Sequence, residues 1–349
     1  MEFLPVSPES LSRAAGILRS GGLAAFPTET VYGLGADAYN SAALVKIFEA
    51  KNRPRFDPLI IHIAAVETLE DAADLSLLDK ETRRKLFLLS EKLWPGPLSI
   101  VLPKSGKIPG IATAGLSTAA IRFPAHDAAQ KLISLAGGAV AAPSANPFGA
   151  LSPTRAEHVR DGLGGKVDII LDGGPAQIGV ESTVLDITNG NIKILRHGGT
   201  PKEAIESLIG AVQDGSFSAA EAAGSMVSPG QLKSHYAPRT PLSVFTAEEI
   251  PHLPCEKDAA YLFFDNFSRD LWIKKQNTAA NNCLNSGKEL NDTVIRVLSP
   301  CGKAAEAASF LFETLHELDL SGILRIFAQF APEEGLGAAI NDRLRRASA

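Results

Sequence analysis

The chain contains 349 residues, of which 45% are hydrophobic, and its formal net charge is −5. This length favours two domains over one, and the composition excludes a largely disordered chain. The acidic balance gives no overall attraction to nucleic acid, although it permits a local basic site.

Cysteine usage and the first residues limit the class of protein further. Cys255, Cys283 and Cys301 show no CxxC spacing, so neither a disulfide framework nor a zinc site is expected. Residues 1–10 lack the basic and apolar regions of a secretory signal, and no apolar run reaches transmembrane length. We therefore expect a cytoplasmic protein that makes no membrane contact.

Helix caps and apolar spacing predict the first elements. Ser7 and Pro8 suit the start of a helix that ends at Gly21. The apolar run 23–26 then predicts a buried strand, which is followed by a polar loop over 27–35. Asn40 is placed to cap a second helix, which Pro54 closes.

The middle of the chain mixes helices and strands. Capping boxes of Thr154 with Glu157 and of Thr200 with Glu203 predict two helix starts. Several predicted strands follow one another directly, so the sheet should contain antiparallel pairs. We predict a helix at 81–93 and strands at 59–63, 98–102, 119–123, 139–142, 167–171, 183–187 and 192–195.

The last third has the pattern of a connection followed by a second domain. Residues 211–241 lack periodicity and are rich in Ala, Gly, Ser and Pro, which is typical of an interdomain linker. We therefore predict one domain over 1–210 and a small parallel α/β domain over 242–349. Its predicted strands are 242–245, 259–264, 293–298 and 323–327, with helices at 303–318 and 335–346.

Four polar segments follow or adjoin predicted strands, where loops commonly carry substrate groups. No phosphate loop, dinucleotide fingerprint, zinc-protease motif or nucleophile elbow accompanies them. Each segment also has a structural interpretation, in which hydroxyls and amides cap local turns and cations complement a helix dipole. The segments are FPTETVYGLG at 26–35, KNRPRFDPLIIH at 51–62, APSANPFGALSPT at 142–154 and GVESTVLD at 179–186.

Two arginines end predicted buried strands, Arg122 in IRFP and Arg196 in ILRHG. A buried guanidinium is costly to leave unpaired, so each either belongs to a structural ion pair or binds an anion. His62, among aliphatic neighbours, is by itself more often a hydrogen-bonded core histidine than a catalytic one.

A series of motifs resembles, in its order, the motif set of the YrdC family, including its KxR and SxN pairs. The motifs are PTETVYGLG, KNR, PLIIH, WPGPLS, IRFP, APSAN with SPT, GVESTVLD and ILRHG. SPG and HYAP within 211–241, before a further α/β domain, resemble the long two-domain form of threonylcarbamoyl-AMP synthase. The resemblance implies a mixed α/β fold (α+β) with a twisted sheet and helices around a concave basic cavity. It also implies a smaller Rossmann-like α/β C-terminal domain.

The resemblance implies a reaction as well. Members of this family convert L-threonine, bicarbonate and ATP into threonylcarbamoyl-AMP and pyrophosphate, and other enzymes then load the group onto tRNA. Mg²⁺ is expected to accompany ATP, and no protein residue is assigned as its ligand. Clustered cations would offset the repulsion among three anionic reactants.

The site residues follow from the matching motifs. The implied catalytic residues are Lys51, Arg53, Ser144 and Asn146. The implied L-threonine contacts are Thr30, His62, Arg122, Ala142 and Ser182. The implied ATP contacts are Arg53, Asp57, Thr118, Ser144, Ser152, Arg196, His235 and Tyr236.

Three expectations accompany this assignment. Asp57 stands where family members commonly have Asn, so its carboxylate should face ribose, base or metal rather than phosphate. Lys51 and Arg53 should be accessible to solvent, so that either can be removed without loss of the fold. His235 and Tyr236 should lie on a linker that folds over the active site and excludes water from a labile adenylate.

Two alternatives remain from the sequence. The first is a double-stranded RNA or ribosome-binding module without catalysis, in which the cations contact phosphates; the acidic total and the lack of interleaved aromatic residues count against it. The second is a carbamoyl-transfer domain of a hydrogenase-maturation type, although the zinc-binding cysteines of that larger protein are missing.

Overall fold

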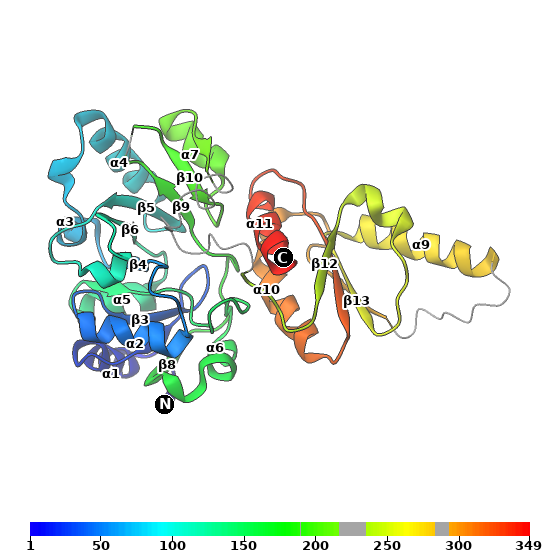
Figure 1. Ribbon diagram of the computed structural model, residues 1–349, viewed down its shortest axis with the longest axis horizontal. Coiled ribbons are helices and arrows are strands. Elements are labelled where there is room, and N and C mark those ends of the chain that lie inside the picture. The colour runs from blue at the N-terminus through cyan, green and yellow to red at the C-terminus, as the bar shows by residue number, and fades with distance from the viewer. Residues whose placement is uncertain (189, 216–234, 283–292) are drawn as a thin grey trace. The chain divides into compact units, whose positions relative to one another are not determined.

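The computed structural model describes residues 1–188, 190–215, 235–282 and 293–349. These residues form two compact units (Figure 1). Residues 1–148 and 152–215 make up the first unit, and residues 149–151 join those from 235 onward in the second. No helix within these ranges is long and apolar enough to cross a membrane.

The first unit contains the larger sheet. Its strands are β1 Glu2–Pro5, β2 Ala24–Phe26, β3 Gly33–Asp37, β4 Ile60–Ile63, β5 Leu98–Pro103, β6 Thr118–Arg122, β7 Ala139–Ala141, β8 Ile169–Asp172, β9 Thr183–Asp186, β10 Lys193–Arg196 and β11 Gln213–Asp214. Its helices are α1 Pro8–Arg19, α2 Ser41–Lys51, α3 Leu69–Ala72, α4 Lys80–Leu93, α5 Asp127–Ala136, α6 Ala156–Leu163 and α7 Lys202–Ile209. Short 3₁₀ turns lie at Val66–Thr68, Leu75–Leu77, Gly110–Thr113 and Gly164–Lys166.

The sheet is mixed, as predicted. Its strand order is β1-β8-β2-β3-β7-β4-β6-β5-β9-β10-β11. The pairs β4/β6 and β5/β9 are parallel, whereas β4/β7, β5/β6 and β9/β10 are antiparallel. All the predicted strands overlap observed ones, because buried apolar runs bounded by Gly and Pro locate strands well.

The two faces of this sheet differ. On the core face, alternate residues of β4, β5, β6 and β9 pack with α2, α4, α6 and α7. On the opposite face, which we call the site face, α1 and α5 pack over β2, β7 and β8. Farther along the site face, a small separate apolar cluster consists of Ile60, Val101, Ala120, Val184 and Leu195.

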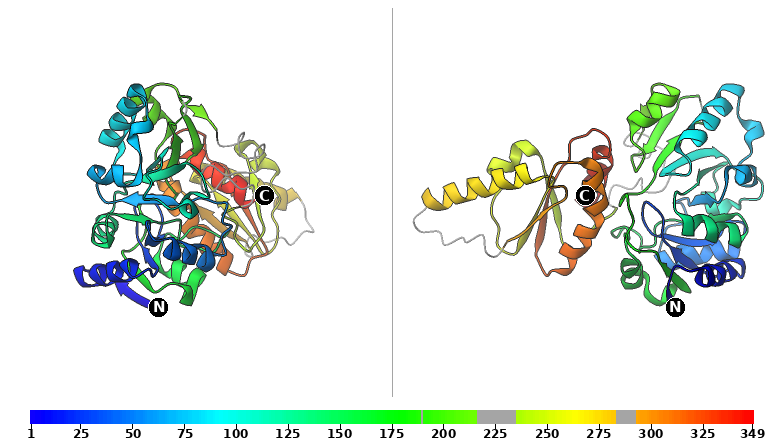
Figure 2. Two further views of the ribbon diagram at one scale, coloured as in Figure 1. Left: turned by 60° about the vertical axis from the view of Figure 1, so that its left-hand side comes forward. Right: turned by 180° about the vertical axis from the view of Figure 1, so that it is seen from behind.

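The second unit is a parallel α/β domain, which confirms the predicted fold class. Strands β12 Leu242–Phe245, β13 Ala259–Phe263, β14 Val294–Val297 and β15 Arg325–Gln329 form a sheet of order β12-β15-β13-β14, with all pairs parallel. A 3₁₀ helix, Ala247–His252, follows β12. Helix α9 Asn266–Asn282 covers one face, and α10 Ala304–Leu320 and α11 Gly337–Ala347 cover the other (Figures 1 and 2).

Some helix starts are confirmed. Ser7 caps α1 and forms a capping box with Ser10, and the Asn40 side chain accepts from the amides of Ala42 and Ala43 at the start of α2. These caps depend only on residues close in sequence, and for that reason the sequence could predict them.

The two capping boxes predicted at Thr154 and Thr200 are wrong. Helix α6 begins after Arg155 and α7 after Pro201, and neither N-cap residue makes a side-chain hydrogen bond to its helix. The Thr200 amide donates instead to Thr183 Oγ1 of β9 at 3.1 Å. A tertiary partner thus replaces the local one.

Several elements were missed. The sequence analysis did not predict β1, α5 and α9, and it placed the start of β3 within a polar loop. The sequence of β3, GLGAD, contains no β-branched or aromatic residue, so propensity gives little signal. Its strand conformation depends on pairing between β2 and β7.

The predicted linker is only partly described. Residues 216–234 lie outside the described residues, and so does the SPG segment. Residues 235–241 belong to the second unit, in which the Ala237 amide donates to the Gly149 carbonyl oxygen at 2.9 Å. Folding of the linker over an active site therefore stays a prediction.

Candidate active site

Five polar side chains lie in a row along the site face. His62 of β4 pairs in register with Arg122 of β6, and Arg122 pairs with Ser99 of β5. Ser99 Oγ lies 2.8 Å from the Oγ of Ser182, which directly precedes β9. Arg196 of β10 donates to the Ser182 carbonyl oxygen at 2.9 Å. We call these five residues the polar row; at about 4.8 Å between strands, it spans roughly 19 Å.

A β-bulge places the last member of the row. The register between β9 and β10 shifts between Ile194 and Arg196. Such a bulge re-aims side chains, and here the Arg196 guanidinium bonds to both the carbonyl oxygen and the hydroxyl of Ser182. The position of Arg196 is therefore fixed both by the bulge in β10 and by its hydrogen bonds to Ser182.

Arg122, the second member of the polar row, forms an ion pair with Glu29. The nearest guanidinium nitrogen lies 2.6 Å from Glu29 Oε1, and both side chains are buried, at 5% and 4% exposure. Arg122 Nε also donates to the Gly96 carbonyl oxygen. Glu29 comes from the loop between β2 and β3, where its own carbonyl oxygen accepts from the Ile178 amide.

Two histidines flank this ion pair. Burial, together with the charge of Arg122, lowers the pKa of His62 to about 3. Burial also lowers the pKa of His126, although Glu29 acts in the opposite direction. Both imidazoles are therefore neutral near pH 7, and Arg122 supplies the positive charge beside Glu29.

Lys51 lies in a second cluster at the end of α2. Its ammonium group donates to the carbonyl oxygens of Ser144 and Asn146, and its own carbonyl oxygen accepts from the Phe148 amide. The side chain is 1% exposed, and burial lowers its pKa well below the usual range. Lys51 therefore fixes the 144–148 loop.

Arg53 fixes the next loop. It donates to the carbonyl oxygens of Asp57 and Pro58 and lies 2.8 Å from the Asp57 carboxylate. Burial raises the pKa of Asp57, whereas Arg53, Lys51 and Arg196 oppose that rise. The Asp57 carboxylate thus faces the Arg53 guanidinium and offsets its charge. The expected contact of Asp57 with ribose, base or metal stays a prediction.

A group of buried residues with mixed charge, which we call the cation cluster, thus lies here. Its members are Lys51, Arg53, Asp57, Glu181 and Arg196. Glu181 acts on the pKa of Lys51, and it accepts from the Ser152 hydroxyl. The expectation that Lys51 and Arg53 are accessible to solvent is wrong, since they are 1% and 7% exposed. Their burial reflects their bonds to backbone carbonyl groups of neighbouring loops.

The remaining predicted L-threonine residues adjoin the polar row. Thr30 Oγ1 lies 2.8 Å from Thr28 Oγ1, and the Thr30 carbonyl oxygen accepts from the Gly179 amide. Ala142 follows β7, and its amide donates to the carbonyl oxygen of Ile60 on β4. These contacts join the 26–35 segment to the 179–186 segment and the 142–154 segment to the 51–62 segment.

The remaining predicted ATP residues lie in several places. Ser152 contacts Glu181 of the cation cluster, and Ser144 reaches that cluster through its backbone. The side chain of Asn146 donates to the Pro147 carbonyl oxygen. Thr118 begins β6, four residues from Arg122 and on the same face, so it lies about 13 Å from the polar row along the strand.

His235 and Tyr236 belong to the second unit. Tyr236 is 2% exposed and has a φ of 63°, and its ring contacts Phe312 and lies beneath the Arg343 guanidinium at 5.0 Å. The His235 amide donates to the Arg346 carbonyl oxygen. These contacts dock the pair on α10 and α11, and their contact with a nucleotide stays a prediction.

Sequence reasoning gave no role to Glu29, Ser99, His126 and Glu181, although Glu29, Ser99 and Glu181 lie within the quoted motifs. Three of them become recognisable through a partner distant in sequence: Glu29 through Arg122, Ser99 through Ser182, and Glu181 through Ser152. From the sequence, the available signal for these roles was the presence of Glu29 and Glu181, which are charged, within the quoted motifs.

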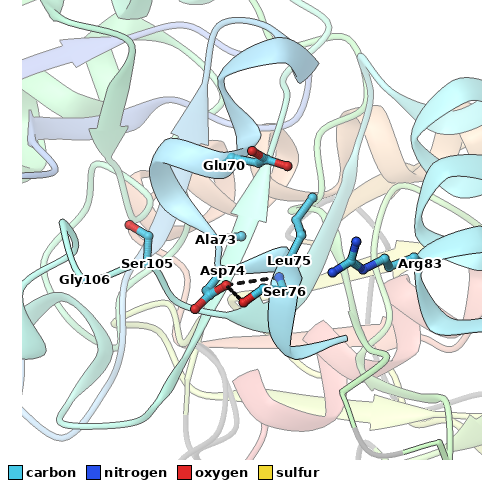
Figure 3. A pocket seen from close by; sticks show the side chains of 8 residues that line it. All are labelled: Glu70, Ala73, Asp74, Leu75, Ser76, Arg83, Ser105 and Gly106. Carbon is cyan, nitrogen blue, oxygen red and sulfur yellow. Dashed lines mark hydrogen bonds between the residues drawn. The ribbon is translucent and has the colours of Figure 1, made fainter. Parts of the chain in front are cut away.

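A pocket of about 380 Å³ lies elsewhere in the first unit (Figure 3). Asp74 at its edge accepts from the amide and hydroxyl of Ser76, while Glu70 and Arg83 provide further charge. None of the predicted site residues lines it. We therefore place the candidate active site at the polar row and the cation cluster.

The described residues contain no group of three or more His, Cys, Asp or Glu that could hold a metal ion. The two carboxylates of the cation cluster already have partners in Arg53 and Ser152. We assign neither carboxylate as a metal ligand.

Two family models match the chain. The model described as "Telomere recombination", which covers the YrdC-type domain, matches residues 16–198. The model described as "Threonylcarbamoyl-AMP synthase, C-terminal domain" matches residues 200–349.

Proteins named threonylcarbamoyl-AMP synthase match over most of the chain. The Pyrococcus abyssi protein is 41% identical, over 96% of this chain and 93% of its own. The Bacillus subtilis protein is 38% identical, over 99% and 94%. The Schizosaccharomyces pombe protein is 35% identical, over 97% and 88%.

Solved structures agree with these matches. The crystal structure of the P. abyssi protein complexed with L-threonine superposes with a TM-score of 0.81 and 38% identity, covering 99% of this chain and 96% of that one. A double-alanine variant of the P. abyssi protein at a His-Tyr pair gives the same TM-score at 36% identity, covering 100% and 96%.

Proposed function

This chain belongs to the threonylcarbamoyl-AMP synthase family in its two-domain form, and on that basis we propose that it joins L-threonine, bicarbonate and ATP into threonylcarbamoyl-AMP, releasing pyrophosphate. The observation that carries the proposal is the polar row, which connects the Glu29–Arg122 pair to the cation cluster across adjacent strands. A site for a small amino acid and a site for a polyphosphate thus share one rigid sheet.

In the proposed reaction, L-threonine lies at the His62–Arg122 end of the polar row. Arg122 is the partner for its carboxylate, because a guanidinium matches a carboxylate in charge and shape. Ser182 and Thr30 supply hydroxyl groups nearby. A relative of this chain has been crystallised with L-threonine, which supports this substrate.

ATP lies toward the opposite end, where Arg196 and the cation cluster face its phosphates. The threonine nitrogen captures carbon dioxide or bicarbonate, and a carbamate oxygen attacks the α-phosphorus as pyrophosphate leaves. No protein nucleophile is needed, so the enzyme works by positioning and by charge. When bound with ATP, Mg²⁺ would neutralise phosphate charge.

The product contains a mixed anhydride, which hydrolyses readily. We propose that the reaction consuming it is transfer of the threonylcarbamoyl group to tRNA by separate enzymes, and that the chain acts in the cytoplasm. The acidic net charge of the chain counts against the alternative of an RNA-binding module.

The test is pyrophosphate release from ATP with L-threonine or bicarbonate omitted in turn, and with mass detection of the adenylate. We expect release only when both are present, together with the mass of threonylcarbamoyl-AMP. Release that is indifferent to threonine would overturn the substrate assignment. Salt-sensitive binding of double-stranded RNA without turnover would instead favour the non-catalytic alternative.

A further inference from the structure

Glu29, like Asp57, is a buried carboxylate that is paired with an arginine. Its side chain is 4% exposed and lies 2.6 Å from an Arg122 nitrogen, yet among the described residues neither carboxylate oxygen takes part in an aligned hydrogen bond. A carboxylate can accept about four hydrogen bonds, and leaving that capacity unused in a buried site is costly.

The position of Glu29 is fixed by its backbone. Its carbonyl oxygen accepts from the Ile178 amide at 2.8 Å, and the next residue, Thr30, accepts from the Gly179 amide. The Thr28 hydroxyl bridges to the Val31 carbonyl oxygen within the same loop. The loop therefore holds the carboxylate beside Arg122 rather than letting it turn toward solvent.

The charges around the pair are balanced. His62 and His126 are neutral near pH 7 because burial lowers the pKa of each, so Arg122 is the cation that opposes Glu29. A ligand with a single negative group would leave this site with a buried net charge. A zwitterion keeps the total at zero.

We infer that Glu29 binds the α-ammonium group of the amino-acid substrate, while Arg122 binds its α-carboxylate. This inference rests on the proposed function and adds the residue that selects for a free α-amino group. An ammonium group carries three donors and can satisfy the Glu29 oxygens that lack aligned partners. The same contact would hold the reacting nitrogen in place, and the ammonium group would give up a proton to Glu29 or to bicarbonate before the free amine captures carbon dioxide.

A purely structural ion pair between Glu29 and Arg122 predicts a different result. Its loss would reduce stability, and it would weaken every ligand of the site by a similar factor. A direct contact with the ammonium group instead predicts that only ligands carrying that group are weakened. The two roles are therefore separated by comparing ligands rather than by activity alone.

The experiment is a binding cycle at equilibrium without ATP. Calorimetry would compare L-threonine with 2,3-dihydroxybutanoate of matching configuration, in which a hydroxyl replaces the ammonium group. We expect the unmodified protein to bind L-threonine at least about 10-fold more tightly than the hydroxy acid. Glu29→Gln should weaken L-threonine by about 10- to 100-fold without weakening the hydroxy acid, because loss of the carboxylate leaves Arg122 to pair with the carboxylate of the ligand. Exposed Glu67 provides the control, and Glu67→Gln should keep both affinities.

An unchanged preference for L-threonine in folded Glu29→Gln would overturn the inference. Equal affinity of the unmodified protein for both ligands would overturn it too, and that arm remains decisive if Glu29→Gln does not fold. Adenylate synthesis by the unmodified protein separates this failure from failure of the proposed function. If the unmodified protein synthesises the adenylate and only the ligand preference fails, the proposed function stands without Glu29.

Discussion

Lys51 connects the end of α2 to the 144–148 loop through a single buried ammonium group. Its bonds to two carbonyl oxygens explain how a lysine tolerates nearly complete burial, since each bond replaces part of the lost hydration. The lysine of the KxR motif therefore holds the backbone of the 144–148 loop in position. Phosphate contact by Lys51 stays a prediction.

We predict that Lys51→Met reduces pyrophosphate release by at least about 100-fold, because the 144–148 loop loses its fixed position. It should also lower the stability of the first unit by about 2 kcal/mol, since two buried carbonyl groups lose a donor. Turnover assays and hydrogen exchange of the β4 and β6 amides would measure the two effects. Exposed Lys92→Met is the control, and full activity in Lys51→Met would contradict the assigned role.

His62 gives the site a defined response to acid. Its pKa is about 3 in the folded chain, against an ordinary value of 6.5, so the unfolded chain takes up the proton first. Above pH 6.5, His62 is neutral in both states and does not affect the free energy of unfolding. As the pH falls from 6.5 toward 3, only the unfolded chain takes up the proton, and the folded chain loses stability.

Between pH 6.5 and pH 5 this loss should amount to roughly 1.5 kcal/mol. The His62→Gln variant should lack it. The measurement is the difference in unfolding free energy between the two proteins at each pH, from hydrogen exchange in the first unit. Parallel pH profiles for the two proteins would show that His62 does not carry the effect.

Helix α2 shows how one element positions two functional side chains. The helix ends at Lys51, and Asn52 adopts a left-handed conformation, with a φ of 52° and a ψ of 39°. This turn directs Lys51 toward the 144–146 carbonyl groups and Arg53 toward those of residues 57 and 58. The spacing of the KxR motif is thus the spacing across a helix C-cap.

We predict that Asn52→Gly retains full activity and stability within a few tenths of a kcal/mol, because glycine adopts this conformation without strain. Asn52→Val should lose about 1–2 kcal/mol and most of the activity, because a β-branched residue resists it. Parallel denaturation and turnover measurements test both variants. Equal behaviour of the two would show that the cap conformation does not position the cations.

On the scale of the whole chain, His235 and Tyr236 are the predicted site residues that lie in the second unit. Their contacts with Phe312, Arg343 and the backbone of Arg346 are sufficient to order them there. If they also cover the nucleotide, they protect the adenylate from water.

We predict that combining His235→Ala with Tyr236→Ala lowers the ratio of threonylcarbamoyl-AMP to released pyrophosphate, because exposed adenylate hydrolyses to AMP. The lost tyrosine ring should also destabilise the second unit by about 3–5 kcal/mol. Tyr236→Phe keeps the ring and serves as the control. An unchanged product ratio in the double variant would refute the protective role.

The sequence by itself determined the features that depend on neighbours along the chain. Apolar runs located the strands, and Ser7 and Asn40 located helix starts, because strand periodicity and caps are local. The ordered motifs also identified the family, and with it most members of the polar row. The comparisons confirmed that family.

Only the tertiary structure decided how those residues pair. Thr200 bonds across to β9 instead of capping its own helix, Lys51 is buried rather than exposed, and Asp57 faces Arg53. Glu29 gains a role only when Arg122, distant in sequence, is brought within 2.6 Å. Burial and long-range charge depend on which strands become neighbours, and strand order is a property of the folded sheet rather than of any single segment.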